Sequence, residues 1–248
     1  MRVVKSIFIK QVDDFLKNPT VTMIFILFPM MAWVMTRFMT TGEPGEAFGM
    51  IVGIALMSVA SMPITAITTY IAEDVETHSL RFLVMAGVKP IHYLTGLAIF
   101  SLLLSAVVMV AFAFIGQLES YDIPMFLGVT MIGCVASLIL GAILGLLSKN
   151  VQQASVYTTV FGMGLGFIPF ISMFNPGLVG YTFFLYTQQI FTILLYLSLG
   201  RGPEATANIY AATGYNFSVT SSIIIIAANI VVLLILFAIM YKRKGLKG

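Results

Sequence analysis

Long runs of apolar residues without a single charge most constrain what this chain can fold into. Six of them span residues 21–36, 50–71, 94–115, 125–147, 156–174 and 221–240. A helix rises about 1.5 Å per residue, so about twenty residues cross a hydrocarbon core about 30 Å thick. Only 9% of the 248 residues are charged, against roughly 25% in soluble domains. The sequence therefore predicts an all-α membrane protein with six transmembrane helices.

A seventh uncharged run, residues 178–199, is also long enough to be a span, so charge placement has to decide. With six spans, eleven of the thirteen Lys and Arg residues fall on the side of both termini, whereas seven spans would divide them seven against six. Basic residues are enriched on the cytoplasmic side, and the run carries Gln188 and Gln189 at its middle. We therefore expect cytoplasmic termini, with residues 175–217 forming outer re-entrant or interfacial helices.

Residues 1–20 alternate charged and apolar side chains in a pattern typical of an amphipathic helix. One face of the helical wheel carries Val4, Phe8, Val12, Phe15 and Leu16. Such a helix suits the headgroup layer of a membrane, and the Asn-Pro pair that follows should end it. The spans, loops and tails account for residues 1–248, so we expect a single transmembrane domain without a separately folded soluble domain.

Motifs for catalysis and ligand binding are missing from the sequence. It has no G-x-x-x-x-G-K-[ST] phosphate loop, no G-x-S-x-G elbow and no H-E-x-x-H pair. The spans contain no ionisable carboxylate or base of the kind that ion-driven carriers use. We therefore predict no catalytic, cofactor-binding or metal-binding residue in this chain. An ion-coupled transporter or channel stays open as an alternative, and an intramembrane hydrolase is a more remote one.

One span carries small residues at every fourth position. These residues are Gly133, Ser137, Gly141 and Gly145, which share one face of a helix. Small faces let two helices approach closely in lipid, where van der Waals contact replaces the missing hydrophobic drive. The face could serve helix packing within the chain or an interface between subunits, and the sequence leaves both uses open.

The loop at 72–93, between the second and third runs, is both charged and amphipathic. Its acidic and basic residues can lie beside apolar ones on a short helix that stops near Gly87 and Pro90. A solvated connector would have this pattern, and so would a helix that docks into a partner protein. The loop alone does not separate the two interpretations.

Here the sequence resembles the permease subunits of ABC-2 type ABC transporters, whose loop reads approximately E-x-E-x-G-T-L-E-x-L-x-x-x-P-V and is followed soon by a glycine. The matching stretch is DVETHSLR at 74–81, followed by Leu83, Gly87-Val88 and Gly96. The sequence departs from the pattern at His78 and Gly87, where the pattern has glycine and proline, at Arg81, where it has an acid, and at Leu97, where a basic residue often stands. The order and spacing of the spans, the N-terminal helix and the outer helices extend the resemblance over almost the whole chain.

The resemblance implies the permease subunit of an ATP-driven exporter that works by alternating access in the plasma membrane. Two separate ATPase chains would bind ATP and Mg²⁺, and a second permease copy or paralogue would complete the pathway. The loop would be the coupling helix that contacts the ATPase. Its coupling residues would be Asp74, Glu76, His78, Leu80, Arg81, Leu83 and Gly87.

The composition of the spans bears on the cargo. Uncharged spans that contain many Met, Phe and Tyr residues favour a hydrophobic or amphipathic cargo, such as a drug, an antimicrobial peptide or a peptide toxin. The family also includes exporters of polysaccharide, teichoic acid and sodium, which the sequence leaves open. No nucleic-acid partner is expected.

Overall fold

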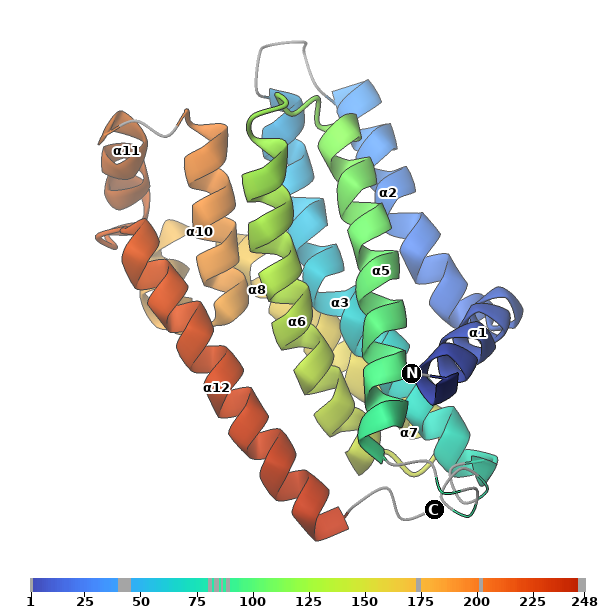
Figure 1. Cartoon of the computed structure of the whole chain (residues 1–248). Coiled ribbons are helices and arrows are strands. Elements are labelled where there is room, and N and C mark those ends of the chain that lie inside the picture. The colour runs from blue at the N-terminus through green and yellow to red at the C-terminus, as the bar shows by residue number, and fades with distance from the viewer. Residues whose placement is uncertain are drawn as a thin grey trace.

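The computed structural model describes residues 2–39, 46–79, 82, 85, 87, 90–172, 175–200 and 203–244. Every regular element in these residues is a helix (Figure 1). Six helices are long and apolar enough to cross a membrane, counting α7, η1 and α8 as one. They are α2 (Pro19–Met39), α3 (Glu46–Glu76), α5 (Pro90–Ile115), α6 (Ile123–Leu147), the composite of α7 (Val151–Tyr157), η1 (Thr158–Met163) and α8 (Gly164–Ser172), and α12 (Val219–Lys244). The prediction of six apolar helices, typical of a multi-pass membrane protein, is confirmed.

Helix α3 lies at the centre of the bundle. In its apolar segment, 94% of the residues are buried within the chain, compared with 22% for α2 and 6% for α12. It contacts α2, α5, α6, α10 and the composite fifth helix. A helix that is apolar all round is expected to be enclosed by protein or lipid, and here other helices of the same chain enclose α3.

The composite fifth helix contains a π-helical turn, η1, between α7 and α8. Its glycines bring it close to α3. A Cβ atom added at Gly162 would lie 3.3 Å from the Cα of Ser61, and one at Gly166 would lie 2.8 Å from the Cα of Met57. These two glycines therefore serve the close packing of the fifth helix on α3. Pro169 lies inside α8 without ending it.

Helix α1 (Arg2–Lys17) crosses the bundle beside α5 (Figure 1); we call this end of the bundle the α1 end. The rings of Phe8 and Phe15 pack edge-on against Phe100, with centroid distances of 5.7 and 6.0 Å. Val12 and Leu16 are exposed, and their contact with the headgroup layer stays a prediction. Packing against α5 draws the two phenylalanines inward, and Ile7 of the same helix is buried as well. As predicted, α1 ends just before the Asn-Pro pair.

The segment predicted as outer helices forms four short elements. They are η2 (Pro176–Leu178), α9 (Val179–Thr182), α10 (Tyr186–Ser198) and α11 (Pro203–Thr213). The longest, α10, has 13 residues, too few to cross a bilayer that needs about 17–25. It lies beside α6 and α12, with α11 near its C-terminal end (Figure 1). The seventh span therefore does not form, and re-entrant placement of these helices stays a prediction.

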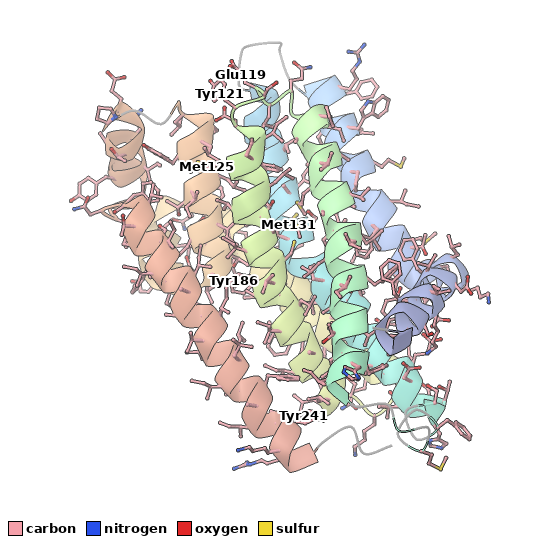
Figure 2. The ribbon with its side chains drawn as sticks, in the orientation of Figure 1. Glu119, Tyr121, Met125, Met131, Tyr186 and Tyr241 are labelled. Carbon is pink, nitrogen blue, oxygen red and sulfur yellow. The ribbon has the colours of Figure 1, made fainter. Side chains whose placement is uncertain are left out.

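The small-residue face of α6 packs within the chain. A Cβ atom added at Gly141 would lie 2.9 Å from the Cα of Ile64 on α3, and those at Gly133 and Gly145 would meet side chains at 2.3 and 2.9 Å. The fourth residue, Ser137, is hydrogen-bonded through its Oγ to the Tyr186 hydroxyl of α10 at 2.8 Å. Figure 2 marks Tyr186 beside α6. Of the two uses that the sequence left open, the structure has the packing of helices within the chain.

Replacing Gly141 by alanine is expected to lower the free energy of unfolding by about 1–3 kcal/mol, because the new Cβ would force α3 away from α6. The matched control is Gly128→Ala on the same helix, where an added Cβ meets nothing within 4 Å. That change should be neutral or stabilise the protein by up to about 1 kcal/mol. Thermal unfolding in detergent measures both, and equal midpoints for the two variants would contradict the packing account.

Candidate functional site

Asp74 lies in the last turn of α3, at the α1 end, and binds three other segments. Only 3% of its surface is exposed. Its Oδ1 atom accepts hydrogen bonds from Lys10 Nζ of α1, at 2.6 Å, and from Ser79 Oγ. Its Oδ2 atom accepts from the hydroxyl of Tyr93 on α5, at 2.6 Å. One carboxylate therefore joins the central helix to α1 and α5.

The Lys10 ammonium group compensates the buried charge of Asp74. An ionised carboxylate out of water is costly unless it is paired and hydrogen-bonded. Burial by itself lowers the pKa of Lys10, but the hydrogen bond and charge of Asp74, helped by Asp14, outweigh this and raise the pKa above its usual value of 10.5. Lys10 Nζ lies 3.6 Å from Asp14 Oδ2 as well. Lys10 therefore remains charged at neutral pH.

Glu76 caps the start of the fifth helix. Its Oε2 atom accepts a hydrogen bond from the backbone N–H of Val151 at 2.8 Å. Beside it, Asn150 Oδ1 accepts from the backbone N–H of Gln153, also at 2.8 Å. The first N–H groups of a helix lack partners within the helix, and negative charge there is stabilising. Glu76 thus fastens the end of α3 to α7.

A third carboxylate in this turn reaches the junction of α1 and α2. Asn18 Nδ2 donates to Glu73 Oε2 at 3.5 Å, and Asn18 stands between the last residue of α1 and the first of α2. Glu73, Asp74 and Glu76 therefore bind different parts of the chain. The end of α3 is the point at which α1, α5, α7 and the α1–α2 junction meet.

His78 ends α3 in a left-handed backbone conformation, with φ of 57°. The N–H of Thr77 donates to the carbonyl of Glu73, and that of His78 to the carbonyl of Val75. Left-handed residues of this kind often terminate helices and are usually glycine, because a Cβ costs roughly 1–2 kcal/mol there. Gly87, with φ of 77°, adopts a similar conformation further along the loop.

The structure separates the residues predicted to contact an ATPase. Asp74 is buried, whereas Glu76, His78 and Gly87 are exposed. Leu80, Arg81 and Leu83 lie outside the described residues. The predicted loop at 72–93 is shorter than expected, because α3 continues to Glu76 and α5 begins at Pro90.

Sequence reasoning missed Lys10, Ser79 and Tyr93 as partners of Asp74. Lys10 stands 64 positions from Asp74, and the sequence presents it only as one of several basic residues near the N-terminus. The sequence could indicate that an acid beside a membrane span, such as Asp74, needs a basic partner. It could not indicate which base is that partner, because this depends on how α1 packs.

A second polar cluster holds α10 against its neighbours. Gln188 and Gln189 are each 1% exposed. Gln189 Oε1 accepts from Ser222 Oγ of α12 at 2.6 Å, and Gln188 Oε1 lies 3.3 Å from Ser172 Oγ of α8. Asn229 Nδ2 of α12 donates to the carbonyl of Phe184, just before α10, at 2.8 Å. Polar side chains noted in the sequence as unfavourable for a span therefore fasten α10 to α8 and α12.

Neither a group of metal ligands among the described residues nor comparison with known proteins assigns a role to these polar clusters. Within the described residues, no group of three or more His, Cys, Asp or Glu side chains could hold a metal ion. No family model matches the chain, and no curated protein matches it in sequence. What the arrangement at the end of α3 can do is mechanical: movement of the segment after Glu76 would be passed to the helices bound there.

Replacing Lys10 by methionine is expected to lower the free energy of unfolding by about 1–3 kcal/mol, because Asp74 would lose its compensating charge while remaining buried. The control is Lys17→Met, which removes an equal charge from an exposed position in the last turn of the same helix. It should change stability by less than about 0.5 kcal/mol. Unfolding in detergent at pH 7 compares them, and a smaller loss for Lys10→Met than for Lys17→Met would be inconsistent with this role.

Proposed function

We propose that this chain is the permease subunit of an ABC-2 type exporter and is driven by a separate ATPase. The observation that carries the proposal is the convergence of α1, α5 and α7 on the last turn of α3, where the segment with the ABC-2 pattern begins. A partner that pushes on this segment would move several membrane helices together. The chain would therefore need no ATP site of its own.

The short polar bonds at the end of α3 suit the transfer of force. Asp74 and Glu76 each bind another helix at 2.6–2.8 Å. Charged hydrogen bonds in a partly buried place are stronger than exposed ones. Displacing the residues after Glu76 would pull on α1 through Lys10 and on the fifth helix through Val151. Through this coupling the permease would switch between inward-facing and outward-facing states.

The backbone conformation of His78 supports the motif match. The ABC-2 pattern has glycine at this position, and His78 adopts a left-handed φ of 57°, which glycine adopts without steric penalty. Although His78 is not glycine, its backbone has the left-handed conformation that glycine commonly adopts. This agreement supports treating residues 74–87 as the coupling region.

The proposed orientation puts the α1 end in the cytoplasm of a cell whose plasma membrane the chain crosses six times. Lys149 follows α6 there, and Lys242 and Arg243 are exposed near the end of α12. Basic residues favour the cytoplasmic side. Glu119 lies at the opposite end of the bundle (Figure 2) and would face outward. Two such chains, or one with a paralogue, would form the pathway together with two ATPase chains that hold ATP and Mg²⁺.

The cargo that best fits this chain is hydrophobic or amphipathic, such as a drug, an antimicrobial peptide or a peptide toxin. The exposed side of the fifth helix carries Val160, Phe161, Met163 and Phe167. Thr159 and Gln152 are exposed on the same helix. A surface that mixes apolar, aromatic and uncharged polar groups is suited to amphipathic molecules.

The tagged chain is expected to co-purify with a separate ATP-hydrolysing protein. In nanodiscs containing the co-purified complex, Glu76→Ala should lower the ATPase activity by at least about fivefold. This is the smallest change that coupling between two sites typically produces. Arg81→Glu should act in the same direction. Glu119→Gln, at the opposite end, is the control and should have no effect. Normal coupling in Glu76→Ala, or transport that follows the proton gradient and ignores ATP, would contradict the proposal.

The orientation has its own test. In a Cys134→Ser background, Lys247→Cys should resist an impermeant thiol reagent in intact cells and react after the cells are opened. Glu119→Cys in the same background should react in intact cells. Labelling of Lys247→Cys from outside would overturn the proposed topology.

A further inference from the structure

Two buried polar side chains, one on α1 and one on α3, lack hydrogen-bond partners among the described residues. Gln11 of α1 and Tyr70 of α3 are each 1% exposed. Within the described residues, the amide nitrogen and oxygen of Gln11 have no hydrogen-bond partner. The Tyr70 hydroxyl has none either. Buried polar groups in folded proteins are nearly always hydrogen-bonded. Their oxygens are therefore available to a ligand that the polypeptide itself does not supply.

Two carboxylates stand next to these groups. Asp14 lies three positions after Gln11 on α1, and Glu73 three positions after Tyr70 on α3, so each pair shares a helix face. The Tyr70 hydroxyl is within the electrostatic reach of both carboxylates, and Glu73 is within reach of Asp14. The bond between Lys10 and Asp74, at 2.6 Å, holds the two helices together beside them. The Tyr70 hydroxyl and the two carboxylates therefore lie near one another, and Gln11 stands one turn before Asp14 on the same face of α1.

Negative charge exceeds positive charge at this place. Asp14, Glu73 and Asp74 contribute three carboxylates, and the ammonium group that faces them is that of Lys10, which lies 2.6 Å from Asp74 and 3.6 Å from Asp14. Glu73 has a 3.5 Å contact with the neutral amide of Asn18. Like charges repel more strongly in a partly buried position than in water. Among these side chains, a single cation, Lys10, therefore faces three carboxyl groups.

We propose that a hard metal cation binds between Asp14 and Glu73, with the Gln11 carbonyl and Tyr70 hydroxyl oxygens as neutral ligands. Carboxylate, carbonyl and hydroxyl oxygens are the ligands that Mg²⁺ and the other hard cations prefer. The site contains only two carboxylates, so the ion keeps part of its water shell. The side chain of Asp14 is 29% exposed, which gives the ion access from the surrounding solution.

The bound ion would join α1 to α3 beside the Lys10–Asp74 bond. Its positive charge removes the repulsion between Asp14 and Glu73. Its stabilising effect does not require ATP, an ATPase or a cargo. Success or failure of the binding experiment is therefore separate from success or failure of the proposed transport function.

Tb³⁺ serves as the probe, because it binds hard oxygen sites and emits when a nearby tyrosine absorbs light. The purified full-length chain in detergent, freed of metal, should give saturable Tb³⁺ emission that Mg²⁺ displaces. The emission should be lost in the double variant Asp14→Asn, Glu73→Gln and weakened in Tyr70→Phe. It should persist in Asp13→Asn, an exposed acid on the same helix, and in Glu119→Gln at the opposite end. Displaceable emission that is unchanged in the double variant would overturn the site.

Thermal unfolding identifies the natural ion. MgCl₂, CaCl₂, KCl and NaCl are compared at constant ionic strength, and the physiological ion should raise the unfolding midpoint by about 3–6 °C at ten times its Kd. The double variant should not respond. In metal-free buffer it should unfold at a higher temperature than the unmodified chain, because the repulsion is gone, and this reversal distinguishes lost binding from misfolding. A midpoint that rises on acidification to pH 5 but responds to none of the salts would show that a proton occupies the site, and would refute the metal.

Discussion

The close contact between α3 and α6 is the constraint on which the rest of the bundle depends. In lipid, apolar surfaces gain little from meeting each other, so helices associate where backbones can touch. Gly141 brings α6 against Ile64 of α3, and Thr68 Oγ1 donates to the Gly141 carbonyl across the same contact at 2.9 Å. With α6 so close, α3 can be enclosed by its neighbours and its ends become fixed points for the other helices.

One of these fixed points is the last turn of α3, which is polar and is hydrogen-bonded to several other helices. The last turn of α3 leaves the apolar part of the bundle and presents three carboxylates, each of which binds a different part of the chain. Asp74 is buried and compensated by Lys10, whereas Glu76 caps the fifth helix from an exposed position. A rigid core that ends in a set of charged bonds can transmit movement applied from one side. The permease proposal requires this property, and the proposed cation site would modulate it.

Away from α3, the fold exposes a large apolar surface. Only 6% of the apolar segment of α12 is buried, yet its Ser222 and Asn229 bind α10 and the residues before it. Polar contacts thus position a helix that has few close-packed neighbours. The glutamines hold α10 against α8 and α12, since Gln188 and Gln189 would lose these partners if α10 moved away.

The sequence by itself determined the six apolar helices, the break at Pro19 and the close packing of the α6 face, because apolar length, proline and small residues act locally or within one helix. The resemblance to the ABC-2 pattern also singled out Asp74 and Glu76, as expected coupling residues. Only the tertiary structure decided that Asp74 is paired with Lys10 and Tyr93, that Glu76 caps the fifth helix, and that Phe8 and Phe15 of α1 pack against Phe100 of α5. Those outcomes depend on which helices meet, and partners far apart in the chain leave no periodic signal in the sequence.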